Sequence, residues 1–575
     1  MFGFIGSYGD MKELSTYHEF GEKSNLLRKN VCENKFTFRQ SSLKKFERDK
    51  VFVNTEKLLL CVEGVIYNLS ENRETLEQSN EEALLLLYKK YGENIVSHLN
   101  GNFAMIIWDK EKDCVLLYAN HTSYKPLYYW YDAKNLLFST DLCWLYDTLY
   151  LNNKKIQLSK SGAYCLLSHG YMLDEVTLVN HVKKVMAGHY IVYNKGECRN
   201  VTYLDYSKIE LDTRNYKIIL EDANTHFNRA IKLVYDKDKE YGYKHICTLS
   251  GGLDSRSVLF ASRELGYKEQ LCITMAQSNT LDQKIAGKIA DDLAVENVFY
   301  SLDKGNYLKN IDKAIEANGG TITYQGFAHT MKLLDVLDLK DYGSIHTGEL
   351  GDCVFGGHDI AEYSEPSFIG DGAFSQKLLN RIPEDFSKYV LNKYKTKYEF
   401  FLFGRGLNSA VNGWLASNYH TESSSPFIDK DFLCFMLSVP EKYRAESKFY
   451  LHWMKKYHPT MYQYKWEATN ALPGAGRFRK MLGRVERKIK RDFLKMPYHM
   501  NPYSQWYKEN ETLKSFFEIQ YNEDIKNISN DELLQAANIL YNESVKEKFQ
   551  VLTLLRAVKR FHIDCSFGEE KYYEK

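Results

Sequence analysis

The stretch Leu249-Ser250-Gly251-Gly252-Leu253-Asp254-Ser255 decides the fold of the C-terminal part of this chain. It lies between HICTLSG (245–251), an apolar run typical of a buried strand, and RSVLFASREL (256–265), which has helical periodicity. A second apolar run, LCITMA (271–276), and a second helical pattern, DQKIAGKIADDLA (282–294), repeat the alternation. Strands that alternate with helices predict a parallel α/β sheet.

The residues of this turn suit a phosphate ligand. Gly251 and Gly252 let the backbone approach a ligand closely, and the following helix offers unpaired N–H groups and the positive end of its dipole. Ser250 and Ser255 add hydroxyl donors. Asp254 would repel a bare phosphate, so a bridging Mg²⁺ is the expected partner. The lysine of the Walker A pattern is missing. The alternative is a plain strand-to-helix turn without a ligand.

Residues 1 to about 205 follow a different pattern, in which short apolar or alternating runs are separated by turn residues. A helix of good formers, EEALLLLYKKYG (81–92), interrupts these runs. We predict an α+β sandwich of antiparallel strands here, and a mainly helical chain beyond about residue 390. The predicted strands are LLLCVEGVIYNL (58–69), FAMIIWD (103–109), CVLLYAN (114–120), LLFSTDL (136–142) and HYIVYN (189–194), and YKIILEDANTHFNRAIKLVYD (216–236) is a predicted helix.

The bulk composition is that of an ordinary globular protein. The 575 residues predict two or more domains, and the formal net charge of +1 argues against a nucleic-acid partner. We find no signal peptide and no run of roughly 18 apolar residues that would cross a membrane. The 11 cysteines form no CxxC pair and no metal-ligand spacing. We therefore expect reduced thiols in a cytoplasmic protein that is not transmembrane.

Five motifs, in order and spacing, carry a family resemblance. SGGLDS (250–255) resembles the pyrophosphate loop of N-type ATP pyrophosphatases, which split ATP between its α and β phosphates. The other four resemble segments of asparagine synthetases. They are HTGELGDCVFGG (346–357) for SGEGSDExFGGY, SPFID (425–429) for RxPFLD, GVIYN (64–68) for NGEIYN, and NGNFA (100–104) for DGMFAF. The chain thus resembles the asparagine synthetase superfamily, which includes asparagine synthetases, β-lactam synthetases and lasso-peptide macrolactam cyclases.

The resemblance implies a fold and an ATP site. The fold is an Ntn-hydrolase-like αββα sandwich in residues 1–205, followed in residues 206–575 by an adenine-nucleotide α-hydrolase-like (PP-loop ATP pyrophosphatase) parallel-sheet domain with helical additions. Asp254 and Asp352 match the carboxylates that hold Mg²⁺ on the pyrophosphate, Glu349 matches the general base, and Lys465 is similar to the lysine that stabilises the acyl-adenylate. The implied ATP-binding residues are Leu249, Ser250, Gly251, Gly252, Leu253, Asp254, Ser255, Thr274 and Gly348.

Each of these assignments has a structural alternative. Glu349 could be a plain loop or helix-cap carboxylate, and Lys465 a solvated surface lysine, since the alignment is looser there. Cys353 stands where the family has Glu, which weakens the expected metal shell and alters the substrate pocket. A buried thiol in an apolar stretch is normally inert, so we do not expect Cys353 to act as a nucleophile.

The N-terminal half lacks the residues of a glutaminase. The family uses a cysteine at position 2 with its free α-amino group as base, whereas this chain has Phe2, which should also block removal of Met1. Glu63-Gly64-Val65 replaces the glutamine-binding Asn-Gly-Glu, and Asn100 replaces Asp. We predict a domain without glutaminase activity, in which Gly3, Ile5 and Gly6 persist as strand and packing residues.

The resemblance implies an ATP-dependent, AMP- and pyrophosphate-forming amide-bond synthetase that does not hydrolyse glutamine. A macrolactam-forming, lasso-peptide-type cyclase is favoured, since β-lactam synthetases carry Tyr where Glu349 stands. The alternatives are an intermolecular or ammonia-dependent ligase in a biosynthetic cluster and a non-catalytic ATP-binding scaffold. A sulfur-transferring relative on RNA is disfavoured by the charge and the absence of CxxC. A peptide or small-molecule carboxylate is the expected substrate, with a precursor peptide or carrier protein as partner.

One further stretch is open to two interpretations. RFRKMLGRVERKIKRDFLK (477–495) is strongly basic, and its apolar residues have helical spacing. The structural interpretation is an amphipathic helix whose basic face is solvated and whose apolar stripe is buried. The functional one is a docking surface for an acidic partner, such as a leader peptide, a carrier protein or anionic lipid head groups. The last 80 or so residues carry no motif that identifies a function.

Overall fold

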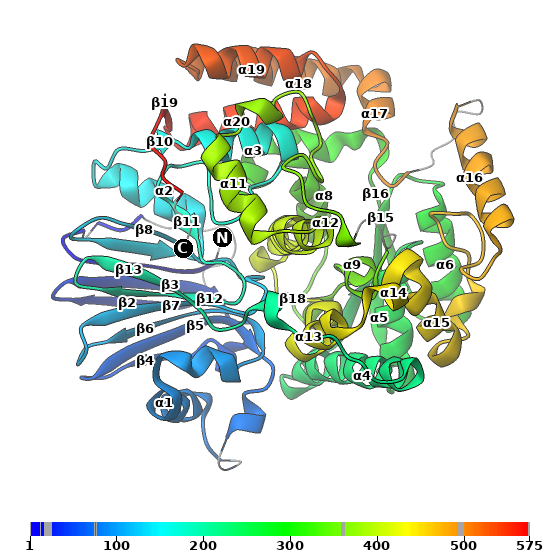
Figure 1. Ribbon diagram of the computed structural model, residues 1–575, viewed down its shortest axis with the longest axis horizontal. Coiled ribbons are helices and arrows are strands. Elements are labelled where there is room, and N and C mark those ends of the chain that lie inside the picture. The colour runs from blue at the N-terminus through cyan, green and yellow to red at the C-terminus, as the bar shows by residue number, and fades with distance from the viewer. Residues whose placement is uncertain are drawn as a thin grey trace.

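Two six-stranded antiparallel sheets lie face to face in the N-terminal half (Figure 1). The computed structural model describes residues 2–572, apart from positions 12, 16–25, 74, 76, 358–362 and 493–498. In spatial order, the first sheet is β11 (Lys183–Lys184), β8 (Tyr128–Tyr131), β9 (Leu136–Ser139), β1 (Gly3–Tyr8), β3 (Phe36–Leu43) and β2 (Leu26–Glu33). The second is β13 (Glu197–Thr202), β12 (His189–Asn194), β7 (Cys114–Ala119), β6 (Gly101–Asp109), β5 (Leu58–Ile66) and β4 (Phe52–Asn54).

Aromatic and aliphatic side chains fill the space between these sheets. Phe4 comes from the first sheet and Ile106 and Leu117 from the second, and all three are fully buried. The Phe36 ring stacks on Trp108 across the interface, with centroids 4.4 Å apart. Because successive side chains of a strand point to opposite faces, the neighbouring residues of each strand are left to pack against a helix.

Helices cover the outer face of each sheet. α1 (Asn80–Tyr91) starts at a capping box on Ser79, and its Leu84 and Leu87 pack in one cluster with Leu60 and Met105 of the second sheet. α2 (Leu142–Leu151) and α3 (Lys160–His169) pack in the same way against the first sheet. The predicted αββα sandwich is therefore confirmed.

The C-terminal half is built on one parallel sheet of five strands. Their spatial order is β16 (Glu296–Ser301), β15 (Gln270–Ala276), β14 (Lys244–Thr248), β17 (Tyr342–His346) and β18 (Ser423–Ser424). On one face lie α4 (Tyr216–Glu240), α5 (Leu253–Glu264) and α6 (Leu281–Leu293), which cover Cys247 and Cys272. On the other lie α7 (Ile311–Asn318) and α8 (Gln325–Leu334), which cover Ile246 and Ile273. The predicted parallel α/β domain is confirmed.

The strand order changes direction between β14 and β17. From β14 the chain adds β15 and β16 on one side, and then crosses to place β17 and β18 on the other. In open α/β sheets, ligands bind outside the carboxyl ends of the strands at such a switch point. The fold therefore directs attention to the two loops that follow β14 and β17.

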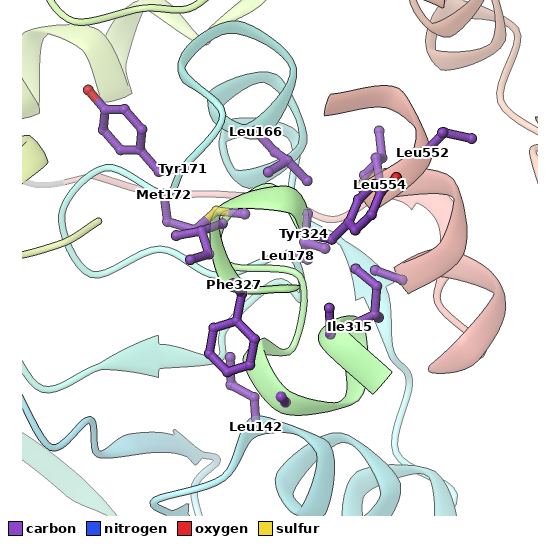
Figure 2. Packing of buried hydrophobic residues seen from close by; sticks show 14 of the residues in the cluster. Leu142, Leu166, Tyr171, Met172, Leu178, Ile315, Tyr324, Phe327, Leu552 and Leu554 are labelled. Carbon is purple, nitrogen blue, oxygen red and sulfur yellow. The ribbon is translucent and has the colours of Figure 1, made fainter. Parts of the chain in front are cut away.

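The C-terminal helices pack back onto the N-terminal half. They are α17 (Tyr503–Glu509), α18 (Glu511–Asp524), α19 (Asp531–Tyr541) and α20 (Val545–Arg560). Figure 2 shows part of this core, in which Leu552 and Leu554 of α20 lie beside Tyr324 of the C-terminal half. Leu166 of α3 and Phe327 of α8 belong to the same cluster. In addition, β19 (Asp564–Phe567) pairs in parallel with β10 (Gln157–Leu158). The last 80 residues thus join the two halves, and the boundary at 205/206 stays a prediction.

The apolar residues of the basic stretch are exposed. α16 (Arg477–Asp492) is a helix as predicted, and Figure 1 places it at the edge of the molecule. The interpretation that its apolar stripe is buried is wrong for the described part, since Phe478 is 69% exposed and Ile489 48%. Residues 493–495 of the stretch lie outside the described residues. Among the described helices, none combines the length and the apolar character that crossing a membrane requires.

Candidate active site

The SGGLDS motif (250–255) and the 346–357 motif follow two adjacent strands of the parallel sheet. β14 pairs in parallel with β17, with Cys247 beside His346, so the turn 249–252 and the loop 347–350 start side by side at the switch point. The first leads into α5 and the second into the short helix α9 (Gly351–Phe355). Residues almost 100 positions apart are thereby brought together by the parallel topology.

Hydrogen bonds within the turn fix its shape. The Ser250 N–H donates to Ser255 Oγ at 3.0 Å, and the Gly252 N–H donates to Ser250 Oγ at 3.1 Å. The Gly251 N–H donates to Asp282 Oδ1 at 3.2 Å. The two serines that were predicted as phosphate donors therefore also hold the backbone of the turn in place.

Three of the predicted ATP-binding residues lie beneath the turn. Leu249 and Leu253 are buried in the core between the sheet and its helices. The Thr274 hydroxyl donates to the Leu249 carbonyl at 2.8 Å, and its oxygen lies 3.1 Å from Asn297 Oδ1. The side chains of these three residues support the turn from below, and a phosphate would meet the backbone above them.

Two glycines allow the second loop to contact Asp254. A Cβ atom on Gly348 would lie 2.4 Å from the Ser255 nitrogen, and one on Gly351 would lie 2.7 Å from Asp254 Cγ. Both separations are shorter than a carbon side chain tolerates, so only glycine permits this approach. Glu349 and Asp352 each follow one of these glycines directly and lie beside Asp254.

Burial and neighbouring charge shift the pKa values of Asp254 and Glu349. Burial raises the pKa of Asp254 well above its usual value, and the charge of Asp352 raises it further. Burial also raises the pKa of Glu349 to about 7, partly opposed by a hydrogen bond from Trp414 and increased by Asp352. The Trp414 Nε1–H donates to Glu349 Oε1 at 2.8 Å. Glu349 is thus a carboxylate that exchanges a proton near neutral pH, as a general base requires.

The residues fit a bound Mg²⁺. Asp254 Oδ1 is buried and accepts no hydrogen bond from the described residues, which is costly for a carboxylate unless a cation binds there. Asp352 is exposed beside it, and its Oδ1 accepts the Cys353 N–H at 2.8 Å. Carboxylate oxygens are the ligands that Mg²⁺ prefers, and it usually takes one or two of them together with phosphate oxygens and water.

The segment around Lys465 packs against the turn. The Glu467 N–H donates to the Gly251 carbonyl at 3.1 Å. The Arg256 guanidinium donates to the carbonyls of Gly251 at 2.6 Å and of Lys465 at 2.8 Å. The side chain of Lys465 is exposed, and its backbone is held next to the glycine-rich turn. The role of this side chain at the candidate site stays a prediction.

Cys353 does not have the properties of a reactive thiol. Burial raises its pKa well above the usual value, and the neighbouring Asp352 carboxylate raises it further. The thiolate is the nucleophilic form, so this environment disfavours nucleophilic chemistry at Cys353.

Two buried residues of this site were missed by sequence reasoning. Arg256 directly follows the SGGLDS motif, and its four carbonyl acceptors include the backbone of Tyr464 and Lys465. Trp414 lies 65 residues from Glu349 in the sequence. No local pattern identifies either role, because each depends on a partner that is distant in sequence.

The N-terminal residues that the family resemblance assigns to a glutaminase pack against the other half of the chain. The buried Phe2 ring lies edge-on to Tyr419, with centroids 6.3 Å apart. A Cβ on Gly3 would lie 1.9 Å from Thr140 Oγ1, so Gly3 is a packing residue as predicted. Asn100 Nδ2–H donates to Asp429 of the SPFID motif at 2.7 Å. Phe2 offers no atom that could attack glutamine.

Four buried charges join the halves at this place. Glu63 is 3.3 Å from Lys50 and 3.6 Å from Lys125, and both lysines also contact Glu422 of the C-terminal half, at 3.1 and 2.9 Å. Each side chain is at most 6% exposed. Glu63, which stands where the family has a glutamine-binding asparagine, is therefore an ion-pair partner between the two halves.

Comparisons with known proteins give matches in both halves. Residues 47–204 match the family model described as "Glutamine amidotransferase domain", and residues 224–399 match "Asparagine synthase". Glutamine-hydrolyzing asparagine synthetase 1 of Bacillus subtilis (strain 168) is 25% identical over 353 residues, 59% of this chain. Two asparagine synthetase-like proteins of Methanocaldococcus jannaschii are 26% identical over 345 residues (57% of this chain) and 23% identical over 453 residues (76%).

The matches cover only part of these relatives. They span 52% of the Bacillus protein, and 62% and 74% of the two Methanocaldococcus proteins. The first family model falls in the N-terminal half of the fold, and the second falls in the C-terminal half.

Proposed function

We propose that this chain, a member of the asparagine synthetase superfamily, is an ATP-dependent ligase that forms amide bonds and releases AMP and pyrophosphate. One observation carries the proposal. Asp254, Glu349 and Asp352 lie together at the switch point of the parallel sheet, against a glycine-rich turn at a helix N-terminus. This arrangement combines a phosphate site, a cation site and a base of near-neutral pKa.

The first step would use the phosphate turn. The backbone of residues 250–255 would bind the pyrophosphate part of ATP, while a substrate carboxylate attacks the α-phosphorus to give an acyl-adenylate. Asp254 and Asp352 would hold Mg²⁺, which neutralises phosphate charge when bound. Arg256 holds the backbone of the 464–467 segment against the turn, and from there the Lys465 side chain would stabilise the developing charge.

The second step would use Glu349. An amine attacks the acyl carbon, Glu349 takes its proton, and AMP leaves with the electrons of the broken acyl–phosphate bond. With a pKa of about 7, roughly half of Glu349 is deprotonated at neutral pH. The Trp414 indole keeps the carboxylate oriented for this transfer.

The amine would not come from glutamine, since Phe2 carries no nucleophile and Glu63 is committed to a buried ion-pair cluster. We favour an amine within a peptide substrate, which makes the product a macrolactam of the lasso-peptide type. A precursor peptide or a carrier protein would then be the partner. The second candidate is an intermolecular or ammonia-dependent ligase, which uses the same residues on a separate amine. A non-catalytic ATP-binding scaffold is the third.

The test separates the two half-reactions. Pyrophosphate release and ATP–pyrophosphate exchange would be measured with Mg²⁺ and panels of aspartate, other acidic metabolites and precursor peptides encoded beside this gene, with and without ammonia. Asp254→Asn should abolish both activities. Glu349→Gln should retain exchange and lose amide formation. Asp338→Asn, an exposed carboxylate in the turn before β17, is the matched control.

The panel also distinguishes the candidates. Turnover on a peptide without added amine supports the cyclase, and turnover that needs a second amine supports the intermolecular ligase. ATP binding without turnover on any substrate, including the peptides of neighbouring genes, would refute the ligase and favour the scaffold.

A further inference from the structure

α16 exposes an apolar stripe along its whole described length. Phe478 is 69% exposed, and the next four apolar side chains on the same side of the helix are 39–51% exposed. These four are Met481, Leu482, Val485 and Ile489. Their spacing places all five on one side of the helix. A helix that displays its apolar side to water needs a partner outside the chain.

The body of the protein holds one flank of the helix, beside the apolar stripe. A Cβ on Gly483 would lie 1.9 Å from the Thr469 carbonyl oxygen, so the helix backbone rests directly on this segment. The Asn470 Nδ2–H donates to Glu486 Oε2 at 2.9 Å. Gly483 and Glu486 are one turn apart and lie to one side of the apolar stripe. The helix therefore cannot roll to bury its stripe without losing these contacts.

The helix concentrates positive charge. Residues 477–492 contain eight Lys or Arg and two acidic residues, a formal charge of +6 in a chain whose total is +1. Arg477, Arg484 and Lys488 are exposed beside the apolar stripe. A polar face rich in Lys and Arg next to an exposed apolar face, with low overall hydrophobicity, is typical of helices that lie in the plane of a membrane interface.

We propose that α16 docks this protein on the surface of an anionic lipid bilayer. The stripe enters the boundary between head groups and acyl chains, and the basic side chains beside it bind lipid phosphates. A bilayer is favoured over a peptide partner because the stripe lies on the exposed surface of a helix at the edge of the molecule, and the three cavities lined by Met186, Arg229 and Lys134 contain no residue of α16. A soft surface moulds around a convex helix, whereas a short peptide needs a groove.

The docking helix is connected to the candidate active site. It rests on Thr469 and Asn470, which follow shortly after Lys465 and Glu467 on the segment that packs against the phosphate turn. Docking would therefore place the candidate active site close to the lipid surface. The proposal does not depend on which substrate the enzyme uses.

The experiment is vesicle co-sedimentation of the full-length protein. Vesicles of phosphatidylglycerol with phosphatidylcholine would be compared with vesicles of phosphatidylcholine alone. We expect the protein to bind the anionic vesicles at least about 10-fold more strongly than the phosphatidylcholine vesicles. Binding to the anionic vesicles should decrease as the salt concentration rises. The double variant F478Q/I489Q should weaken it by at least about 10-fold. The matched control is I218Q/I519Q, which alters two apolar side chains that are 47% and 53% exposed elsewhere.

The outcomes decide the proposal. Loss of binding in F478Q/I489Q, with an unchanged melting temperature and normal binding of I218Q/I519Q, supports it. Absence of binding to anionic vesicles overturns it, and so does equal binding to both kinds of vesicle. A last outcome would assign the stripe to a protein partner and also overturn the proposal. In it, vesicles do not bind, but the protein self-associates in ultracentrifugation or binds a polyglutamate peptide, and F478Q/I489Q abolishes that association.

Discussion

Replacing Trp414 with Phe tests whether Glu349 is the general base and whether Trp414 sets its pKa. In the native protein the Trp414 Nε1–H donates to Glu349 Oε1 at 2.8 Å, and this bond stabilises the deprotonated carboxylate. Phe keeps most of the aromatic volume and removes the donor. Without the bond, the burial and the Asp352 charge that raise the pKa of Glu349 act unopposed.

The size of the effect follows from the strength of the bond. A hydrogen bond to a charged group contributes about 1.5–3 kcal/mol, and one pKa unit corresponds to about 1.36 kcal/mol, so the pKa should rise by about 1–2 units. From a native value of about 7, the variant value is about 8–9. At pH 7 the deprotonated fraction then falls from about one half to between about one tenth and one hundredth.

The assay is the pH dependence of amide formation between pH 6 and 9, with pyrophosphate release measured in parallel. Activity of Trp414→Phe should fall by about 5- to 50-fold at pH 7 and return to within about twofold of wild type at pH 9. Trp506→Phe, which removes an indole N–H that donates to Gln277 at 2.6 Å, is the matched control. A loss that is equal at every pH, or an unchanged profile, would refute the reasoning.

Two further predictions concern close packing and buried charge. Gly351→Ala places a Cβ 2.7 Å from Asp254 Cγ and should reduce ATP-dependent pyrophosphate release by at least about 100-fold. The control is Gly287→Ala on α6, where a Cβ meets no atom within 4 Å. This control variant should keep full activity, and its free energy of unfolding should rise by up to about 1 kcal/mol. The buried lysines lower the pKa of Glu422 to about 2, so its stabilisation is present above about pH 4.5 and is lost as the pH falls towards 2. In urea titrations, Glu422→Gln should therefore lower the free energy of unfolding by about 3 kcal/mol at pH 7 and by much less near pH 2. The control Glu111→Gln removes a carboxylate from an exposed ion pair and should change the free energy of unfolding by less than about 0.5 kcal/mol at both pH values. A deficit that did not shrink in acid would contradict the ion-pair account.

Local sequence was sufficient to predict most of the elements that carry the site. The apolar run before Ser250 and the helical pattern after Ser255 became β14 and α5, within a few residues of the expected bounds. The same holds for β5, β6 and α1 in the N-terminal half. These elements were predictable because period-2 and period-3.6 patterns are local properties of the chain. Gly3, Ile5 and Gly6 were predicted as strand and packing residues and lie in β1, whose place between β9 and β3 only the tertiary structure gives.

The candidate site shows where such reasoning ends. SGGLDS and the 346–357 motif each indicated their residues, but nothing in either motif places Glu349 under the Trp414 indole or Arg256 on the Lys465 carbonyl. The interpretation of residues 477–495 as a buried stripe failed for a related reason. Periodicity shows that a helix has an apolar side and does not show which way that side faces.

The sequence by itself determined the order of the two halves, the parallel sheet, the glycine-rich turn between β14 and α5 and the absence of a nucleophile at Phe2, because each depends on neighbouring residues or on a single side chain. Only the tertiary structure decided that Gly348 and Gly351 bring the second loop onto Asp254, that the pKa of Glu349 lies near neutrality, and that α16 faces outward. The physical reason is that burial, electrostatic coupling and exposure are properties of groups that meet in space, and chain folding brings them together from distant positions.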